Sequence, residues 1–374
     1  MSVRALRPFL TAAVIIIGIG SAAPCIAQIT PAQTITPPDD TPSIRIGATI
    51  FTDFTVTTEP KITDVDGNVV SLSSFNVGRA YINVTGNISH RIAFRITPDI
   101  SRETTTGAGA PSLSGSYVYR LKYAYAQFNL DDWMTRGSWA RFGQQQTPWI
   151  DFEEGIYRYR FQGTVFSERE GFLSSSDVGA SFHYNFPSNY GEVHTGFYNG
   201  ENYNRVEVND QKAFQIRGTL RPLPKSPYLR GLRLTGFYDL DAYVKDADRH
   251  RGIFAVTYEH PHVNAAVEYL NTTDQTRAKA TPPVPKVDAN GYSIWVTPRA
   301  SNGIEGLFRF DHLEPNDNAP GKRDRIIGGV AYWFPHQGNV ATALLFDIEN
   351  VDNHGFSPSR PDERRYALHA LVNF

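Results

Sequence analysis

Cysteine is nearly absent from this sequence, and positive charge is not in excess. Cys25 is the only cysteine among 374 residues, and 36 basic side chains stand against 38 acidic ones. A single cysteine excludes a small secreted scaffold held together by disulfides. The balanced charge gives no electrostatic indication of a nucleic-acid partner. His260 and His262 share one short turn without a third ligand, so we expect no metal site and no cofactor.

Long apolar runs are also missing after residue 27, so a membrane-spanning helix, which needs about 20 apolar residues, is not expected there. Before that point, Arg4 and Arg7 precede an apolar core and the small residues up to Ala27. This order predicts a cleavable signal peptide at 1–27, with an uncleaved anchor as the alternative. Cleavage leaves no cysteine and 34 basic residues, a net charge of about −4. Any residence in a membrane would then require a β-barrel.

The rest of the sequence is rich in aromatic residues and alternates in hydropathy. Phe occurs 23 times and Tyr 19 times. Residues 28–42 are rich in Pro and Thr and predict an extended periplasmic leader. From residue 43 to 374, segments of about ten residues alternate with period two between clusters of turn residues, and no helix-period stretch is evident. We therefore predict an all-β chain with about sixteen strands near 43–56, 76–88, 90–99, 119–130, 138–145, 177–186, 191–199, 213–222, 230–240, 251–259, 263–271, 291–299, 303–312, 325–334, 339–349 and 364–374.

The connections between these strands alternate in length. Short connections are expected at 89–90, 131–137, 187–190, 222–228, 260–262, 300–302 and 335–338, and long ones at 57–75, 100–118, 146–176, 200–212, 241–250, 272–290, 313–324 and 350–363. Short periplasmic turns and long extracellular loops are typical of a transmembrane antiparallel β-barrel of the bacterial outer membrane. A soluble β-sandwich is not expected to alternate in this way. The expected surroundings are therefore outer-membrane lipid.

The two faces of the strands support the same interpretation. In one strand Ala80, Ile82 and Val84 share a face, while Arg79 and Asn83 lie on the other. In a barrel of this kind the apolar face contacts lipid and the polar face lines an aqueous lumen. A barrel of sixteen strands is wide enough for such a channel. Its passive solutes would be small and hydrophilic.

The third long connection, 146–176, contains more aromatic and charged residues than a water-exposed loop requires. We predict that it folds into the lumen, packs its rings against the wall and narrows the channel; an external lid is the alternative. Its candidate constriction residues are Glu153, Glu154, Tyr157, Arg158, Tyr159, Arg160 and Arg169.

Three stretches resemble one known family. RFGQQQTPW at 141–149, SSSDVGASFHYNF at 174–186 and GEVHTGFYNGE at 191–201 are similar to motifs of the phosphate-selective porin O and P family. The resemblance implies a sixteen-stranded porin that forms homotrimers, with a third loop that narrows the channel. It also implies anion selectivity based on Arg and Lys side chains in the lumen.

Inward positions in the first half of the chain are basic by the alternation. The candidates that would line the pore there are Arg79, Arg91, Arg95 and Arg141, joined by Arg120, Lys122, Arg217 and Arg221. Arg is suited to bidentate binding of carboxylate and phosphate. The inward set in the second half is mixed or acidic: Glu268, Glu305, Arg309, Asp311, Asp347 and Glu349. We therefore expect a basic wall and an acidic wall, with a transverse field between them that orients polar or anionic solutes.

The final strand ends on an aromatic residue. Its apolar residues at every second position are Tyr366, Leu368, Ala370, Val372 and Phe374. We expect this strand to pair with the first one near 44–54, which removes the open sheet edge. A terminal Phe after alternating apolar residues resembles the signal read by the barrel-assembly machinery, which is a second expected partner.

Three other functions remain as alternatives. A sugar-type or general porin would use Tyr157, Tyr159 and Phe161 as a track for sugar rings. A closed structural or adhesive barrel would not conduct. A barrel hydrolase needs converging Ser, His and Asp or Asn residues; Ser181 and His183 share a strand face but have no assignable partner, so we expect no enzyme.

Overall fold

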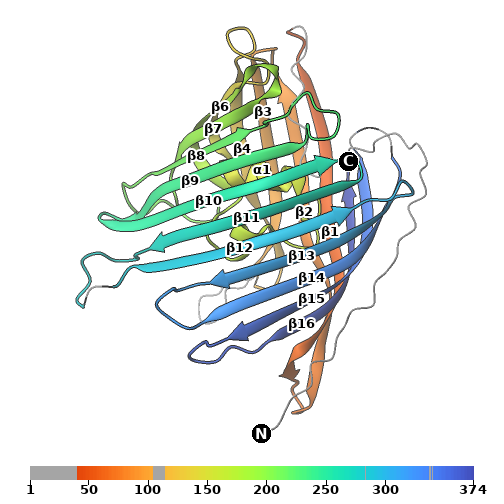
Figure 1. Ribbon diagram of the computed structural model, residues 1–374, viewed down its shortest axis with the longest axis vertical. Helices are drawn as coiled ribbons and strands as arrows, with labels where there is room; N and C mark the ends of the chain where they lie inside the picture. The colour runs from red at the N-terminus through yellow and green to blue at the C-terminus, as the bar shows by residue number, and fades with distance from the viewer. Residues whose placement is uncertain (1–39, 104–113, 283, 337, 339) are drawn as a thin grey trace.

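The computed structural model describes residues 40–103, 114–282, 284–336, 338 and 340–374. The predicted signal peptide and residues 28–39 of the predicted leader lie outside this part. Sixteen strands form one closed antiparallel barrel, as predicted (Figure 1). They are β1 (Ser43–Thr63), β2 (Val69–Asn87), β3 (Ile92–Arg102), β4 (Tyr117–Asn129), β5 (Trp139–Gln146), β6 (Ser176–Asn185), β7 (Gly191–Tyr198), β8 (Ala213–Leu220), β9 (Leu232–Val244), β10 (Ala247–His260), β11 (Val263–Asp274), β12 (Val287–Pro298), β13 (Ile304–Glu314), β14 (Lys322–Trp333), β15 (Ala341–His354) and β16 (Glu363–Asn373).

The barrel closes between its first and last strands. β1 pairs with β16 from Thr49↔Asn373 to Glu59↔Arg364. The hydroxyl of Thr49 donates to the side-chain oxygen of Asn373 at 2.6 Å. Gly47 allows the backbone of Phe374 to lie close to β1, because a Cβ at this position would overlap the carbonyl oxygen of Phe374. Closure leaves no open edge at this junction.

The strands have an apolar outer face and a largely polar inner face. In β16, Leu368 is 50% exposed on the outside, whereas His369 and Leu371 are buried on the inside. The same rule places Phe346 outside and Asp347 inside on β15. A charged inner face and an apolar outer face invert the usual arrangement of a soluble protein.

The connections define two ends of the barrel. Among the described residues, the turn end holds the start of β1, the end of β16 and the connecting residues 88–91, 130–138, 186–190, 221–231, 261–262, 299–303, 334–336, 338 and 340. The loop end holds the connecting residues 64–68, 103, 114–116, 147–175, 199–212, 245–246, 275–282, 284–286, 315–321 and 355–362.

Two of the long connections predicted from the sequence are wrong. The expected loop 57–75 is mostly strand, since β1 continues to Thr63 and β2 begins at Val69. The expected loop 241–250 reduces to a two-residue turn at Lys245 and Asp246, with Asp246 at φ 68°. Both stretches are polar, which suggested loops. Polar residues are compatible with strands that extend past the apolar band of a barrel.

In the described part of the chain, the few helices lie in connections between strands. α1 (Pro148–Ile156) and α2 (Phe166–Arg169) belong to the connection between β5 and β6, and a 3-10 turn spans Pro187–Asn189. The sequence-based expectation of no helix missed α1. No helix in the described ranges is long and apolar enough to cross a membrane.

Candidate functional site

The connection 147–175, called the internal loop below, is the largest element inside the barrel. Thr147 begins α1 and Pro148 occupies its first turn, where a missing N–H costs no helical hydrogen bond. The Thr147 hydroxyl does not cap the helix and instead donates to the carbonyl of Ser174 at 2.5 Å, so the two ends of the loop are tied together.

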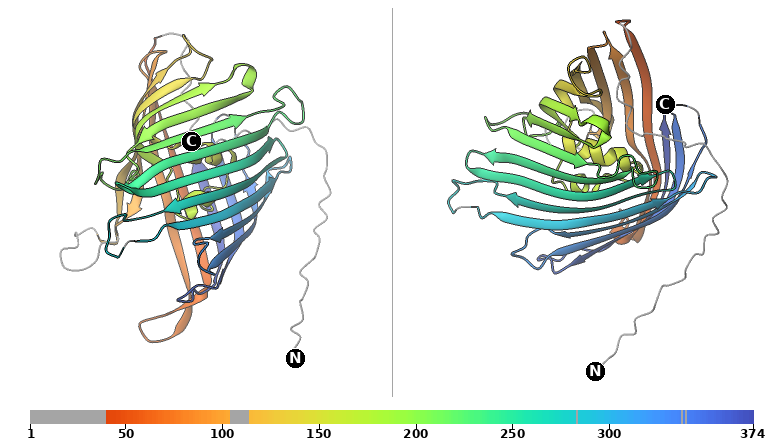
Figure 2. Two further views of the ribbon diagram at one scale, coloured as in Figure 1. Left: turned by 60° about the vertical axis from the view of Figure 1, so that its left-hand side comes forward. Right: turned by 45° about the horizontal axis from the view of Figure 1, so that its top comes forward.

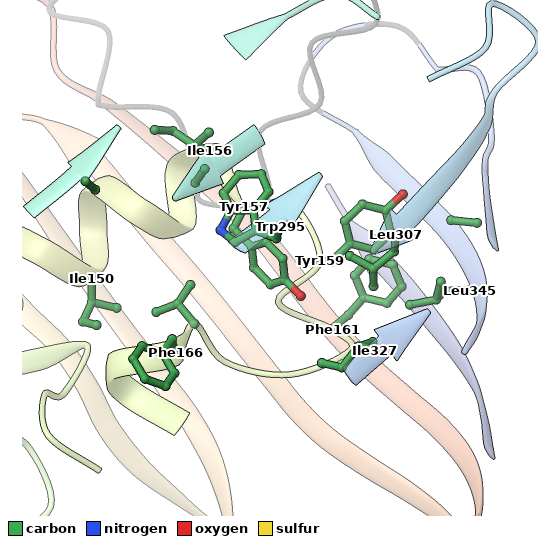
Figure 3. Close-up of a cluster of buried hydrophobic side chains, with 14 of the residues drawn as sticks. Ile150, Ile156, Tyr157, Tyr159, Phe161, Phe166, Trp295, Leu307, Ile327 and Leu345 are labelled. Atoms are coloured by element: carbon green, nitrogen blue, oxygen red, sulfur yellow. The ribbon is translucent and has the colours of Figure 1, made fainter. Parts of the chain in front are cut away.

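The aromatic residues of the internal loop pack against the inner wall. Tyr157 meets Trp295 of β12 edge-on at 5.2 Å between ring centroids (Figure 3). Tyr159 meets Trp333 of β14 edge-on at 5.8 Å between ring centroids. The ring centroids of Trp149 and Phe237 of β9 lie 6.0 Å apart. Each fully buried ring contributes roughly 1.5–3 kcal/mol from apolar burial. This burial explains why a loop with many aromatic side chains lies inside the barrel.

Side chains of the wall donate hydrogen bonds to backbone carbonyls of the internal loop. Arg217 of β8 donates to Pro148 at 2.9 Å, and Arg309 of β13 donates to Thr164 at 2.9 Å. Arg251 of β10 donates to Phe172 at 3.1 Å, and Asn264 of β11 donates to Ile156 at 3.0 Å. Irregular backbone in an interior needs such donors. Arg217, an expected pore-lining residue, therefore holds the loop.

Ion pairs fasten the second half of the internal loop. Arg158 pairs with Glu305 of β13 at 2.9 Å, and Tyr159 donates to the same carboxylate at 3.1 Å. Arg169 pairs with Glu349 of β15 at 3.1 Å. Here the loop supplies the carboxylate and the wall the cation: Glu170 forms ion pairs with Arg323 at 2.7 Å and with Arg325 at 3.1 Å, both on β14.

Helix α1 carries two buried carboxyl groups. Glu154 pairs with Arg160 of the loop at 2.6 Å, and Glu153 lies against Glu268 of β11. Burial raises the pKa of each group, Glu153 and Glu154, to about 7. Both side chains therefore change charge near neutral pH.

The inner faces of β2 to β5, called the basic wall below, carry an excess of positive charge. Asp99 is the one carboxylate in the sequences of these four strands. It lies 3.8 Å from Arg79 and 3.9 Å from Arg120. The basic wall comprises Arg79, Arg95, Arg120, Lys122 and Arg141.

Three cations of the basic wall contact neutral groups. Arg95 donates to Asn83 at 3.1 Å, Lys122 donates to the Tyr81 hydroxyl at 3.2 Å, and Arg141 donates to Gln127 at 2.8 Å. Within the described ranges none of the three has a carboxylate in ion-pair contact. Aromatic rings face them, with Arg141 lying 3.7 Å from the ring centroid of Trp139.

The predicted site residues thus fall into separate places. Arg79, Arg95 and Arg141 lie on the basic wall, and the seven loop residues lie in the internal loop. Arg91 was expected on a strand but lies in the turn 88–91, where it pairs with Asp132 at 2.8 Å. Arg91 precedes the first strand-paired residue of β3, Ile92, which places it at the rim of the turn end.

The two residues considered for a hydrolytic site, Ser181 and His183, each contact a neighbour on β5. Ser181 donates to Gln145 at 2.5 Å, and His183 stacks on Trp139 with ring centroids 5.0 Å apart.

Sequence reasoning missed the wall residues that receive the loop. Trp295, Trp333, Arg251, Arg323 and Arg325 hold the loop but were not singled out. The signal was available for the tryptophans, because each lies at an inward position where a polar residue is expected.

Comparisons with known proteins show the fold. No family model and no curated protein matches the sequence. Among solved structures, the anion-selective porin from Comamonas acidovorans matches with a TM-score of 0.61 and 9% identity, over 89% of this chain and 100% of that one. A loop-deletion mutant of the Vibrio cholerae outer membrane protein OmpT matches with a TM-score of 0.58 and 15% identity, over 90% of this chain and 100% of that one. The outer membrane channel DcaP of Acinetobacter baumannii matches with a TM-score of 0.56 and 10% identity, over 89% of this chain and 97% of that one. The chain therefore has the fold of the outer-membrane porins.

Proposed function

We propose that this protein is an outer-membrane porin that forms a passive aqueous channel for small polar or anionic solutes. The observation that carries the proposal is the inverted barrel, with an apolar outer face and a charged interior. The names of the matched structures, which include porins and a channel, support a channel and not an enzyme.

The proposed location is the outer membrane, reached through a cleaved signal peptide. The turn end, with both ends of the barrel sequence, faces the periplasm, and the loop end faces the outside. Lipid surrounds the apolar face. A homotrimer is proposed from the family resemblance, and one matched structure is the trimer form of the in-vitro folded Vibrio cholerae protein OmpT.

The proposed solute path runs along the basic wall at its most exposed cations, Arg79 and Arg120, whose side chains are 25% and 28% exposed. The loop carries Glu154, Arg160 and Glu168 on this side, where they act electrostatically on Lys122 of the wall. The wall has five cations and one carboxylate, and the loop adds Arg160, Glu154 and Glu168, so positive charge stays in excess and favours anions. Phosphate in particular is not implied, because the wall carries one lysine and no lysine cluster.

A sugar track gains no support from the rings of the loop. Tyr157 and Tyr159 are fully buried against the wall and Phe161 is 5% exposed. Rings in this position cannot stack on a passing sugar.

Conductance in planar bilayers tests the channel. The purified barrel is expected to produce discrete conductance steps. In a salt gradient, the sign of its reversal potential is expected to indicate a preference for anions. A folded, inserted protein without conductance would favour the closed structural barrel, and a strongly cation-selective channel would contradict the anion path.

We also propose that Tyr366, Leu368, Ala370, Val372 and Phe374 form the signal for the barrel-assembly machinery. Deletion of Phe374 is expected to lower the yield of folded, heat-modifiable protein in outer membranes, because the last backbone contacts of Ala48 with Phe374 are lost as well. Replacement of Phe374 by Tyr keeps an aromatic end and serves as the control. Wild-type yield from the deletion would contradict the proposal.

A further inference from the structure

Two arginines of the basic wall converge on one buried carboxylate. β2, β3 and β4 are consecutive in the barrel, where Figure 2 draws them in orange to yellow. Asp99 of β3 lies 3.8 Å from Arg79 of β2 and 3.9 Å from Arg120 of β4. Asp99 is fully buried, and within the described ranges neither of its side-chain oxygens accepts a hydrogen bond. The carboxylate therefore holds the two guanidinium groups near each other through charge, and leaves most of their N–H groups for another acceptor.

Arg120 keeps its donors unused. It donates no hydrogen bond to any described residue, although only 28% of its side chain is exposed. Arg79 makes one long hydrogen bond, 3.4 Å, to the carbonyl of Gly78. Donors withdrawn from water without an acceptor are unfavourable, and a guanidinium binds a carboxylate through two parallel N–H groups. A carboxylate in the lumen would satisfy the donors of both arginines.

A tyrosine from the connection 199–212 lies over the cations of the basic wall. The ring centroid of Tyr203 is 4.8 Å from the guanidinium carbon of Arg120 and 5.3 Å from Nζ of Lys122. Lys122 is fully buried, whereas Tyr203 is half-buried. An accessible aromatic face thus stands next to the arginine that has unused donors.

The backbone before Tyr203 is fixed by side chains of two strands. The N–H of Gly200 donates to Asp177 of β6 at 2.8 Å, and the carbonyl of Gly200 accepts from Arg249 of β10 at 2.6 Å. Asn202 has φ 71°, a left-handed conformation that Asn tolerates better than most residues. These contacts and this turn hold the connection in place, so the position of the Tyr203 ring is defined by the fold.

The charge around the two arginines suits a singly charged anion. Four cations and three carboxylates interact in this region, which leaves one positive charge: Arg79, Arg120, Lys122, Arg160, Asp99, Glu154 and Glu168. Lys122, Arg160 and Glu154 are buried, so the cations that a solute can contact are Arg79 and Arg120.

A second pair of a tyrosine and an arginine provides an internal comparison. Tyr243 of β9 has its ring centroid 4.9 Å from the guanidinium carbon of Arg249. Arg249, however, is bound to the carboxylate of Asp241 at 3.2 Å and to the carbonyl of Gly200 at 2.6 Å. This pair has the aromatic ring, but its cation is already satisfied.

We propose that Arg79, Arg120 and Tyr203 form a subsite for aromatic monocarboxylates. The carboxylate of the solute accepts hydrogen bonds from the two arginines, which Asp99 positions, and the ring of the solute packs against the face of Tyr203. Contact between two rings adds to the attraction of the charges. The proposal names the substrate class of the anion path and rests on the proposed function, which brings solutes to this wall.

Two acids of equal charge and similar size test the subsite. Benzoate has an aromatic face and cyclohexanecarboxylate has none, and both are fully ionised at pH 7.5. Binding is measured by ligand-observed NMR titration of the folded, detergent-solubilised protein, and separately by the block of chloride current in planar bilayers. Tyr203→Leu removes the ring, Tyr203→Phe restores it, and Tyr243→Leu is the matched control.

Benzoate is expected to bind about threefold to tenfold more tightly than cyclohexanecarboxylate, the range of an aromatic pair. Tyr203→Leu is expected to abolish this preference, while Tyr203→Phe and Tyr243→Leu keep it. Arg120→Gln is expected to weaken the binding of both acids at least about tenfold, because a charged hydrogen-bond donor is lost.

Equal affinity for the two acids, or a preference that survives Tyr203→Leu, would overturn the subsite. Conductance separates this proposal from the proposed function. A conducting protein without the preference refutes the subsite alone, whereas a preference in the NMR titration of a protein that does not conduct supports the subsite and refutes the channel.

Discussion

The basic wall and the wall from β8 to β15 line the same interior but use their arginines differently. On β8 to β15 nearly every arginine named above is bound to the internal loop or to a carboxylate, as Arg217, Arg309 and Arg325 are. On the basic wall Arg95 and Arg141 contact amides and rings. Equal residue types at equivalent strand positions thus have different roles. The difference lies in their partners and not in their burial, since Arg95 and Arg141 are themselves only 5% and 4% exposed.

Removal of the internal loop is the most direct test of the difference between the two walls. Deletion of 152–172 uncovers the wall from β8 to β15 and is expected to raise single-channel conductance at least about twofold, because the narrowing element is gone. Deletion of 316–319, in the connection between β13 and β14, is the control and leaves conductance unchanged. Unchanged conductance in the larger deletion would contradict the constriction.

Loss of one arginine from the covered wall tests its structural role. Arg325 contacts Glu170 and Glu349, and both carboxylates are almost fully buried. Arg325→Met is expected to cost about 1–3 kcal/mol in the free energy of unfolding, measured by urea in lipid vesicles, because two buried carboxylates each lose one hydrogen-bonded arginine while Arg323 and Arg169 remain. Arg364→Met breaks an exposed pair with Glu59 and is expected to cost about 0–1 kcal/mol. Equal losses in the two variants would remove the distinction between the walls.

Loss of charge from the basic wall tests selectivity. Arg79 and Arg120 are its most exposed cations, at 25% and 28% of the side chain. The double variant Arg79→Gln, Arg120→Gln is expected to shift the reversal potential toward cations, since two positive charges leave the path. Arg364→Gln at the rim is the control. A reversal potential that stays constant would place the solute path elsewhere.

Acidity should modulate the same path to a smaller extent. Burial raises the pKa of Glu153 and Glu154 to about 7, so both are mostly neutral at pH 5.5 and charged at pH 8.5. Anion preference is therefore expected to fall as pH rises through 7. The folded state holds these protons more tightly than the unfolded chain between about pH 4.5 and 7, so their contribution to stability also falls as pH rises across that window.

Glu153→Gln, Glu154→Gln supplies the control for the pH experiment. This variant keeps every other charged group of the interior but loses the two carboxyl groups. A flatter pH profile is expected. A profile as steep as that of the native chain would assign the effect to other groups.

The strand number and the faces were predictable because period-two alternation is a local property. The conversion of 57–75 and 241–250 into strand was not, since Pro60 and the polar cluster around Lys245 have loop composition while strand pairing depends on the neighbours. The folding of 146–176 toward the wall was predictable from its aromatic content. Its partners were not, because the pairing of Tyr157 with Trp295 or Arg169 with Glu349 joins positions more than a hundred residues apart.

The pairing of β1 with β16 also sets the order in which the molecule can be completed. Thr49 and Asn373 are 324 residues apart in sequence, so the first strand has no partner on that side until the last residues are available. A contact of this range is formed late and slowly. Until then the chain carries two complementary sheet edges, and the same geometry that seals one barrel could join two unfinished chains. Rapid delivery of the last strand to the first therefore protects the protein from its own copies.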